Sequence, residues 1–224
     1  AMVDATLERG VSVYICDAPS FRSWAESDLA AAGVDPTEVN WLDCNLETVW
    51  MRDYGPMFTV NEDALLRIGD ASYYDRPEDN SFPGQASAWW GDDFYEIPLW
   101  MEGGNFFADG NGTCVSTNIV YDWYTPYYSW ITEDFATEVY RSTLGCDETI
   151  WLEPLEGEGT GHVDMFFTYI DEDNVIVGSY TPMDDTFGSN VELLNRNARR
   201  LEDAGYTVHR VPMLPNRDAD GDSW

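Results

Sequence analysis

A unit of strands and turns that recurs along the chain is the sequence feature that most constrains the fold. Three polar motifs, WMRDYGP from Trp50, MEGGN from Met101 and GHVD from Gly161, follow one another at intervals of roughly 50 to 60 residues. Each lies among apolar stretches that read as strands joined by polar turns. Repeats related by rotation bring equivalent positions towards a common axis, so we expect the motifs to meet in one shared site.

Helical patterns separate these strand units. Residues 21–32, 132–144 and 191–204 have helix-forming composition, and each run stops at a glycine. Strands, helices and hairpins in alternation predict an α/β fold. The stretch 75–93, DRPEDNSFPGQASAWWGDD, is punctuated by proline and glycine and is predicted to be a long loop.

The charge balance narrows the classes of partner. The 224 residues include 42 acidic and 11 basic ones, and all 11 are arginine, for a net charge of −31. This argues against nucleic acid, because phosphate binding needs a basic footprint. A negative field concentrates cations, which suits a guanidinium or amine substrate, although a solubilising surface for a salty or extracellular setting is the simpler explanation.

Hydropathy and cysteine content bear on the compartment. No run approaches the roughly 18 apolar residues of a membrane helix, and the first residues lack a signal-peptide pattern. We therefore expect a soluble chain with no membrane partner, and a secreted or extracellular location is favoured over a cytoplasmic one. Cys16, Cys44, Cys114 and Cys146 form no C-x-x-C pair, so they are either reduced core thiols or members of up to two disulfides.

The three motifs place polar side chains among apolar strands, where an unpaired charge costs several kcal/mol. These side chains belong to Arg52, Asp53, Glu102, Asn105, His162 and Asp164. They either satisfy one another or bind a ligand. On a strand, His162 and Asp164 would point to the same face because residues i and i+2 do so. His209 has no acidic companion on its own face and is interpreted as structural.

A planar guanidinium is well matched by carboxylates, each of which accepts two parallel N–H bonds. Asp53 and Asp164, from different repeats, are placed to hold such a cation from two sides. Trp50, three residues before Asp53, offers an aromatic face for stacking, although a core position explains it equally well.

At these residues the chain resembles a known family. WMRDYGPMF at 50–58, EGGNFFADGNGT at 102–113 and GHVD at 161–164, in that order and spacing, are similar to the bacterial peptidylarginine deiminase and agmatine deiminase family of the pentein, or guanidino-group-modifying, superfamily. The resemblance runs over nearly the whole chain. It implies an α/β propeller with pseudo-fivefold repeats and places residues 1–224 in a single deiminase catalytic domain that needs no cofactor.

The resemblance also implies a reaction and residue roles. A Cys thiolate attacks the guanidinium carbon, ammonia leaves, and water hydrolyses the covalent intermediate to a ureido product. By position, Asp53 and Asp164 hold the guanidinium nitrogens, and His162 is general acid and then general base. Further substrate contacts are expected from Trp50, Arg52, Arg76, Glu102 and Asn105.

Two departures from the family pattern qualify these expectations. None of the four cysteines stands where the family has its nucleophile, the chain ends at DADGDSW where related sequences continue, and its beginning lacks the family's first strand. We therefore expect a domain that is incomplete at both ends, with its missing C-terminal piece as a further partner. Arg76 matches one of two arginines that bind a terminal carboxylate in the peptidylarginine enzyme, but Glu78 stands near the other. Peptidyl arginine is the expected substrate, with agmatine, a precursor of putrescine, as the alternative.

Two other classes of function remain. His162, Asp164, Asp53 and Glu102 are also acceptable ligands for zinc or manganese in a metal-dependent hydrolase. Asp218, Asp220 and Asp222 are spaced like calcium ligands, which would suit an acidic non-catalytic module. They lack the glycine and the final glutamate of an EF-hand, so a solvated acidic turn is the simpler explanation.

Overall fold

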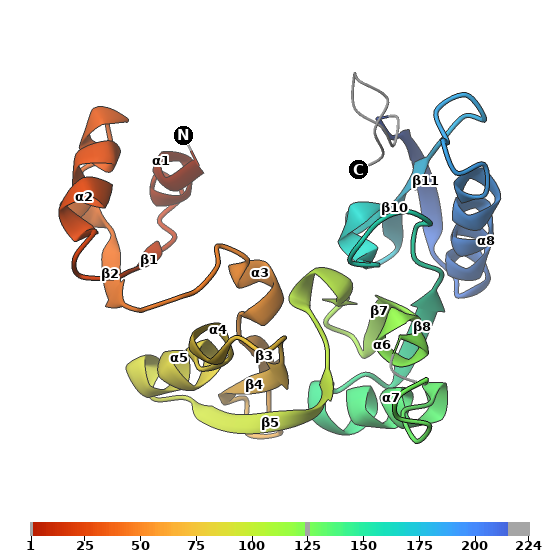
Figure 1. Ribbon diagram of the computed structural model, residues 1–224, viewed down its shortest axis with the longest axis horizontal. Helices are drawn as coiled ribbons and strands as arrows, with labels where there is room; N and C mark the ends of the chain where they lie inside the picture. The colour runs from red at the N-terminus through yellow and green to blue at the C-terminus, as the bar shows by residue number, and fades with distance from the viewer. Residues whose placement is uncertain (1, 124–125, 215–224) are drawn as a thin grey trace.

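Small sheets with helices between their strands make up the protein, which is an α/β fold as expected. The computed structural model describes residues 2–123 and 126–214. Figure 1 shows the units following one another in an arc, with α3 (Met51–Tyr54) on its inner side. None of the helices in these ranges combines the length and apolar character that crossing a bilayer requires.

Three of the sheets share one plan. In each, two strands form an antiparallel hairpin and a third strand pairs parallel with the second after a helical connection. The first of these sheets contains β3 (Met57–Val60), β4 (Leu66–Ser72) and β5 (Asp93–Trp100). The next contains β6 (Phe107–Ala108), β7 (Thr113–Thr117) and β8 (Glu148–Leu152). The last contains β9 (Phe167–Tyr169), β10 (Asn174–Ser179) and β11 (Thr207–Pro212). The repeat read from the sequence is therefore present in the strand pairing.

A fourth sheet contains only two strands in the described ranges. Here β1 (Tyr14–Asp17) pairs parallel with β2 (Asn40–Asp43) across α2 (Arg22–Ala31). The short helices near this end of the chain are α1 (Met2–Leu7) and η1 (Pro36–Glu38).

The three expected helices form close to their predicted bounds. The first is α2, the second is α7 (Glu133–Val139) continued by the π-helical turn η3 (Tyr140–Leu144), and the third is α8 (Asn190–Asp203). The Thr132 hydroxyl caps α7 by accepting a hydrogen bond from the Phe135 N–H at 3.2 Å. Gly145 ends η3 at φ 73°, in the left-handed region that glycine adopts without strain.

The prediction of a long loop over residues 75–93 is wrong. This segment forms α4 (Pro77–Asn80) and α5 (Phe82–Trp90). Pro77 and Pro83 lie in the first turns, where a helix has no use for the missing N–H, so the prolines start these helices and do not break them. Phe82 and Ala86 are buried, and α5 packs on β4.

The largest core cluster lies in the third sheet and beneath α8. Leu193, Leu194 and Leu201 of α8 pack with Val175 and Val177 of β10 in one buried group. A second cluster lies around Tyr140, between α7 and the middle sheet. These clusters hold the strands in place, and the polar motifs lie next to the strand ends.

Both cysteine pairs are disulfide-bonded, which settles the alternative left open by the sequence. Cys16 pairs with Cys44, and Cys114 pairs with Cys146. Each disulfide joins the regions of two parallel strands that a helix separates in sequence, β1 and β2 in one case and β7 and β8 in the other. All four cysteines lie in the described ranges, and no thiol is free there.

Candidate active site

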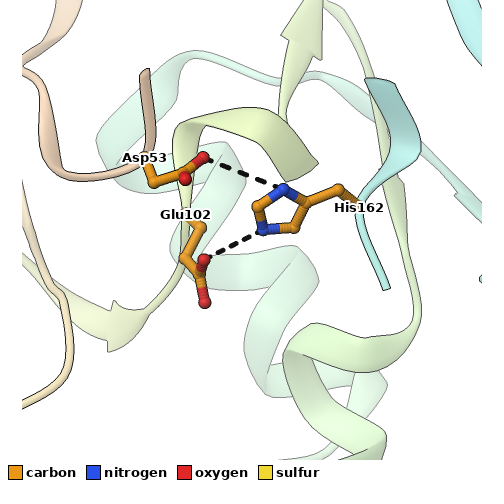
Figure 2. Close-up of side chains that lie close together, drawn as sticks. All are labelled: Asp53, Glu102 and His162. Atoms are coloured by element: carbon orange, nitrogen blue, oxygen red, sulfur yellow. Dashed lines mark hydrogen bonds and ion pairs between the residues drawn. The ribbon is translucent and has the colours of Figure 1, made fainter. Parts of the chain in front are cut away.

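The three polar motifs meet as expected, but short helical turns hold them and not strands. Asp53 lies in α3, Glu102 precedes the 3₁₀ turn η2 (Gly103–Asn105), and His162 precedes the 3₁₀ turn η4 (Val163–Met165). His162 and Asp164 therefore do not lie on a strand, because a tight turn sets their directions, but their side chains do approach one another as expected, with Nδ1 4.0 Å from Oδ1. Figure 2 shows Asp53, Glu102 and His162 converging from three separate segments.

The imidazole of His162 is surrounded by carboxylates. Its Nε2 lies 3.0 Å from Oε2 of Glu102, and its Nδ1 lies 3.8 Å from Oδ1 of Asp53 (Figure 2). Oδ1 of Asp164 is 4.0 Å from the same Nδ1. The His162 side chain is buried, and the three carboxylates are partly exposed. Carboxylates therefore lie on both sides of the ring, those of Asp53 and Asp164 near Nδ1 and that of Glu102 near Nε2.

The protonation of these groups follows from their proximity. Burial alone would lower the pKa of His162, but the hydrogen bond and charge of Glu102, with the charges of Asp53 and Asp164, raise it above its usual value. Burial raises the pKa of both Asp53 and Asp164, and the charge of His162 opposes that rise without cancelling it. The carboxylates therefore favour the positively charged form of the imidazole, and they would equally attract another cation placed beside them.

The two glycines of the EGGN motif allow this close approach. A Cβ on Gly103 would lie 2.0 Å from the backbone oxygen of Arg52. A Cβ on Gly104 would lie 2.4 Å from Nδ1 of His162 and 2.8 Å from Oδ1 of Asp53. The Gly104 N–H also donates to Oδ1 of Asp53 at 3.1 Å. Only glycine lets η2 pack against both α3 and the imidazole.

Asn105 is buried and borders the cavity beside His162. Its Oδ1 accepts hydrogen bonds from the Thr117 N–H at 3.0 Å and from the Val163 N–H at 3.1 Å. Its Nδ2 is buried without a hydrogen-bond partner in the described ranges. The substrate contact expected of Asn105 remains a prediction, and only Nδ2 is left to make it.

A cavity of about 470 Å³ opens beside the imidazole. Glu102 and His162 line it at one side, and Tyr73, Tyr74, Trp100 and Trp123 are among its aromatic walls. Among the described residues that line it, none is a lysine or an arginine, whereas Asp75 adds a further carboxylate. No local sequence pattern predicts these walls, because they come from strand ends and a helix that only the folded chain brings together.

The remaining candidate residues lie around this centre. Nε of Arg52 is 3.9 Å from Oδ2 of Asp164, and its guanidinium lies over the ring of Phe107. Arg76 donates to the Tyr73 hydroxyl at 3.2 Å and lies over the Tyr73 and Tyr74 rings, so it contacts the cavity wall. Trp50 is 59% exposed and is absent from the cavity lining, so its substrate contact also remains a prediction.

Two further assignments lie away from the site. His209 is exposed on β11 and its Nε2 contacts Oδ1 of Asn174 at 2.9 Å, in keeping with the structural interpretation. The calcium ligands suggested at Asp218, Asp220 and Asp222 fall outside the described residues.

Sequence comparison identifies relatives of the chain. A family model described as Porphyromonas-type peptidyl-arginine deiminase matches residues 3–223. The agmatine deiminase of Pseudomonas syringae pv. tomato is 26% identical over 213 residues, which cover 85% of this chain and 56% of that protein. The agmatine deiminase of Pseudomonas savastanoi pv. phaseolicola is 25% identical with the same coverage. The chain thus spans about half the length of the curated relatives it matches.

Solved structures show the same fold. The agmatine deiminase of Enterococcus faecalis superposes with a TM-score of 0.73 at 16% identity, covering 95% of this chain and 64% of that one. A structure described as the C. jejuni agmatine deiminase gives a TM-score of 0.73 at 17% identity, covering 95% of this chain and 62% of that one.

Proposed function

This chain belongs to the Porphyromonas-type peptidyl-arginine deiminase family, and from that premise we propose that its site binds a guanidinium group and takes part in hydrolysing it to a ureido group and ammonia. The observation that supports this most is the ring of Asp53, Glu102 and Asp164 around His162. Three carboxylates around one imidazole suit a planar cation with several N–H donors.

The geometry suggests a division of roles. Asp53 and Asp164 lie on the Nδ1 side of His162 and hold the guanidinium nitrogens. Glu102 accepts from Nε2–H and orients the ring, so Nδ1 is the atom that exchanges protons with the ligand. His162 gives a proton to the departing ammonia and later takes one from the attacking water, which balances the two half-reactions.

The nucleophile comes from outside residues 1–224 in this proposal. Addition to the guanidinium carbon needs a strong nucleophile such as a thiolate, because the group is resonance-stabilised. All four cysteines of the chain are held in disulfides and supply no thiolate. The chain would therefore bind the substrate and position the proton carrier, and would show no turnover by itself.

Agmatine is the substrate we place first, which reverses the order expected from the sequence. The cavity walls are aromatic and acidic, and the described residues that line them include no arginine or lysine to pair with a substrate carboxylate. A guanidine with an amine at its far end suits such walls, since aromatic faces and Asp75 attract a second cation. Several relatives are named agmatine deiminases.

The wider architecture is part of the same proposal. Asp53, Glu102 and His162 come from turns at equivalent ends of successive units. We propose that the sheets described above are units of a five-unit propeller arranged around this site. A structure of a longer chain containing the remaining unit would test this.

Calorimetric titration at low salt with agmatine, free arginine and a peptidyl arginine tests the binding proposal. We expect agmatine to bind best, with its affinity lost in Asp164→Asn and retained in Asp63→Asn, a substitution of an exposed loop carboxylate that removes the same charge. No binding by any guanidine would overturn the proposal. An assay for ureido product on the same samples should show none, and turnover by this chain alone would contradict the assignment of the nucleophile.

A metal-dependent hydrolase is the second candidate, because one observation favours it. Asp53, Glu102 and His162 each offer a ligand atom, and these atoms lie within 4.8 Å of one another. Elemental analysis of protein purified without added metal, together with guanidine binding in the presence of a chelator, separates the two candidates. Stoichiometric metal whose removal abolishes binding would favour the metal site.

A further inference from the structure

We propose that Asn105 is a positioning residue, which holds the turn that bears His162 in place against Glu102 and Asp53. The role differs from the substrate contact expected of Asn105 from the sequence. It rests on the proposed function in so far as His162 is the proton carrier there.

The amide oxygen of Asn105 faces two backbone N–H groups. Oδ1 accepts from the backbone N–H of Val163, the residue directly after His162, and from the backbone N–H of Thr117. Two N–H donors facing one atom settle which end of the amide is oxygen. Asn105 is only 2% exposed, so water does not compete for these bonds. The side chain therefore ties η4 to the end of β7.

The turn η2 contacts both other segments of the site, α3 and η4. Glu102, which bonds Nε2 of His162, directly precedes η2, and Gly104 within it donates to Asp53. The Asn105 backbone is itself held, because the Ser116 hydroxyl donates to its carbonyl at 2.6 Å. One rigid turn thus fixes Glu102, Asp53 and the backbone beside His162 relative to one another.

A second tether holds the same segment. The Thr117 hydroxyl donates to the carbonyl of Gly161, the residue before His162, at 2.6 Å. His162 is therefore held on both sides, through Val163 by Asn105 and through Gly161 by Thr117. Without the Asn105 tether only the Thr117 bond holds the segment, and the Val163 side of the turn can shift and carry the imidazole away from Glu102 and Asp53, whose charges hold the pKa of His162 above its usual value.

The chain offers a matched control in Asn197 of α8. This residue is also fully buried, and its Oδ1 accepts from the Glu153 N–H at 2.9 Å while its Nδ2 donates to the Glu153 carbonyl at 2.8 Å. It is a buried asparagine that tethers a loop by the same chemistry, but none of these bonds reaches η4.

Proton NMR titration of the imidazoles is the test, since the chain has two histidines and His209 is an internal reference. We expect Asn105→Ala to move the His162 titration down towards that of a free imidazole and to leave His209 unmoved. Asn105→Asp retains an acceptor oxygen and should not lower the His162 titration. Asn197→Ala should lower the melting temperature by a comparable amount without moving His162.

The outcomes separate a positioning role from a merely structural one. An unmoved His162 in Asn105→Ala, an equal shift in Asn197→Ala, or a downward shift in Asn105→Asp would overturn the proposal. If Asn105→Ala does not fold, hydrogen exchange in the unaltered chain decides. A slowly exchanging Val163 amide supports the tether, and one as fast as exposed loop amides refutes it. All of these measurements are made without substrate, so failure to bind agmatine would remove the proposed function and leave this result standing.

Discussion

Nε2 of His162 lies 3.0 Å from Oε2 of Glu102, and this contact decides which ring nitrogen is available to a ligand. With Nε2–H donating to the carboxylate, Nδ1 is directed towards Asp53 and Asp164. The same contact favours the charged imidazole. Glu102 is therefore the hydrogen-bond partner of His162. From the sequence we expected it only to contact the substrate.

Glu102→Gln should lower the pKa of His162, because the largest of the effects that raise it is the bond and charge of Glu102. A histidine whose pKa is raised by folding stabilises the protein fully below its unfolded value of about 6.5, and that contribution is lost as pH rises through the folded pKa. The melting temperature of Glu102→Gln should therefore fall furthest below wild type under pH 6.5 and approach it in alkali.

Thermal unfolding across that range and NMR titration of both histidines provide the check. His209, whose contact is with Asn174, is the internal reference in both proteins. A deficit that grows with rising pH would mean that the sign of the linkage, and with it the charged state of His162, has been assigned wrongly.

Gly104→Ala should open the site. The added Cβ would lie between Nδ1 of His162 and Oδ1 of Asp53, and it would have to push them apart. Overpacking of this kind costs roughly 1 to 3 kcal/mol of unfolding free energy. We expect guanidine binding to weaken at least about tenfold, since the misplaced groups can no longer hold the cation together.

Gly84→Ala is the matched control for this change. A Cβ there meets only Phe94 at an ordinary 3.8 Å, and the position lies inside α5. Alanine in a helix is favoured over glycine by roughly 0.5 to 1 kcal/mol, so this variant should be as stable as wild type or more so. Equal binding by the two alanine variants would show that Gly104 does not space the site.

Strand and hairpin units were predictable because each combines alternating apolar residues with a recognisable turn. The grouping of Asp53, Glu102 and His162 was predictable for a related reason, since polar motifs recurred at one place in those units. The local backbone conformation of these motifs was not predictable, because a motif such as GHVD contains no local signal that separates a strand end from a 3₁₀ turn. Pro77 and Pro83 were misread because proline both breaks helices and begins them, and only burial of Phe82 decides between the two.

Asp70→Asn should stabilise the protein at neutral pH. Burial, and then the charge of Glu96 on the neighbouring strand, raise the pKa of Asp70 to about 6. A carboxyl whose pKa is raised by folding contributes its stability below the unfolded value, and loses it as pH rises through about 6. At pH 7.5 the variant should gain about 1 to 2 kcal/mol, a figure discounted for partial exposure.

The gain from Asp70→Asn should vanish near pH 4, where Asp70 is already neutral in the folded protein. Asp63→Asn removes the same formal charge from an exposed loop and should change stability little at either pH. Urea unfolding at both pH values compares the three proteins. A gain that persists at pH 4, or that Asp63→Asn shares, would assign the effect to net charge and not to the partial burial of Asp70.

Opening either disulfide should destabilise the fold without creating an active enzyme. Cys16–Cys44 and Cys114–Cys146 span 28 and 32 residues, and closing loops of this length stabilises by about 3 to 4 kcal/mol through lost entropy of the unfolded chain. Paired Cys→Ala substitutions should each lower the unfolding free energy by about that amount. Bonds of this kind persist in oxidising compartments.

Thiol titration tests whether all four cysteines are disulfide-bonded in the native protein. The native protein should present no reactive thiol to a chromogenic disulfide reagent, and the reduced, denatured protein should present all four cysteines. Added reductant should lower the melting temperature in steps that the two paired variants identify, since each variant lacks one step. It should not produce ureido product from agmatine, because Cys114 and Cys146 are each only 1% exposed, outside the described lining of the cavity. Turnover that appears on reduction and disappears in one paired variant would place the nucleophile within this chain.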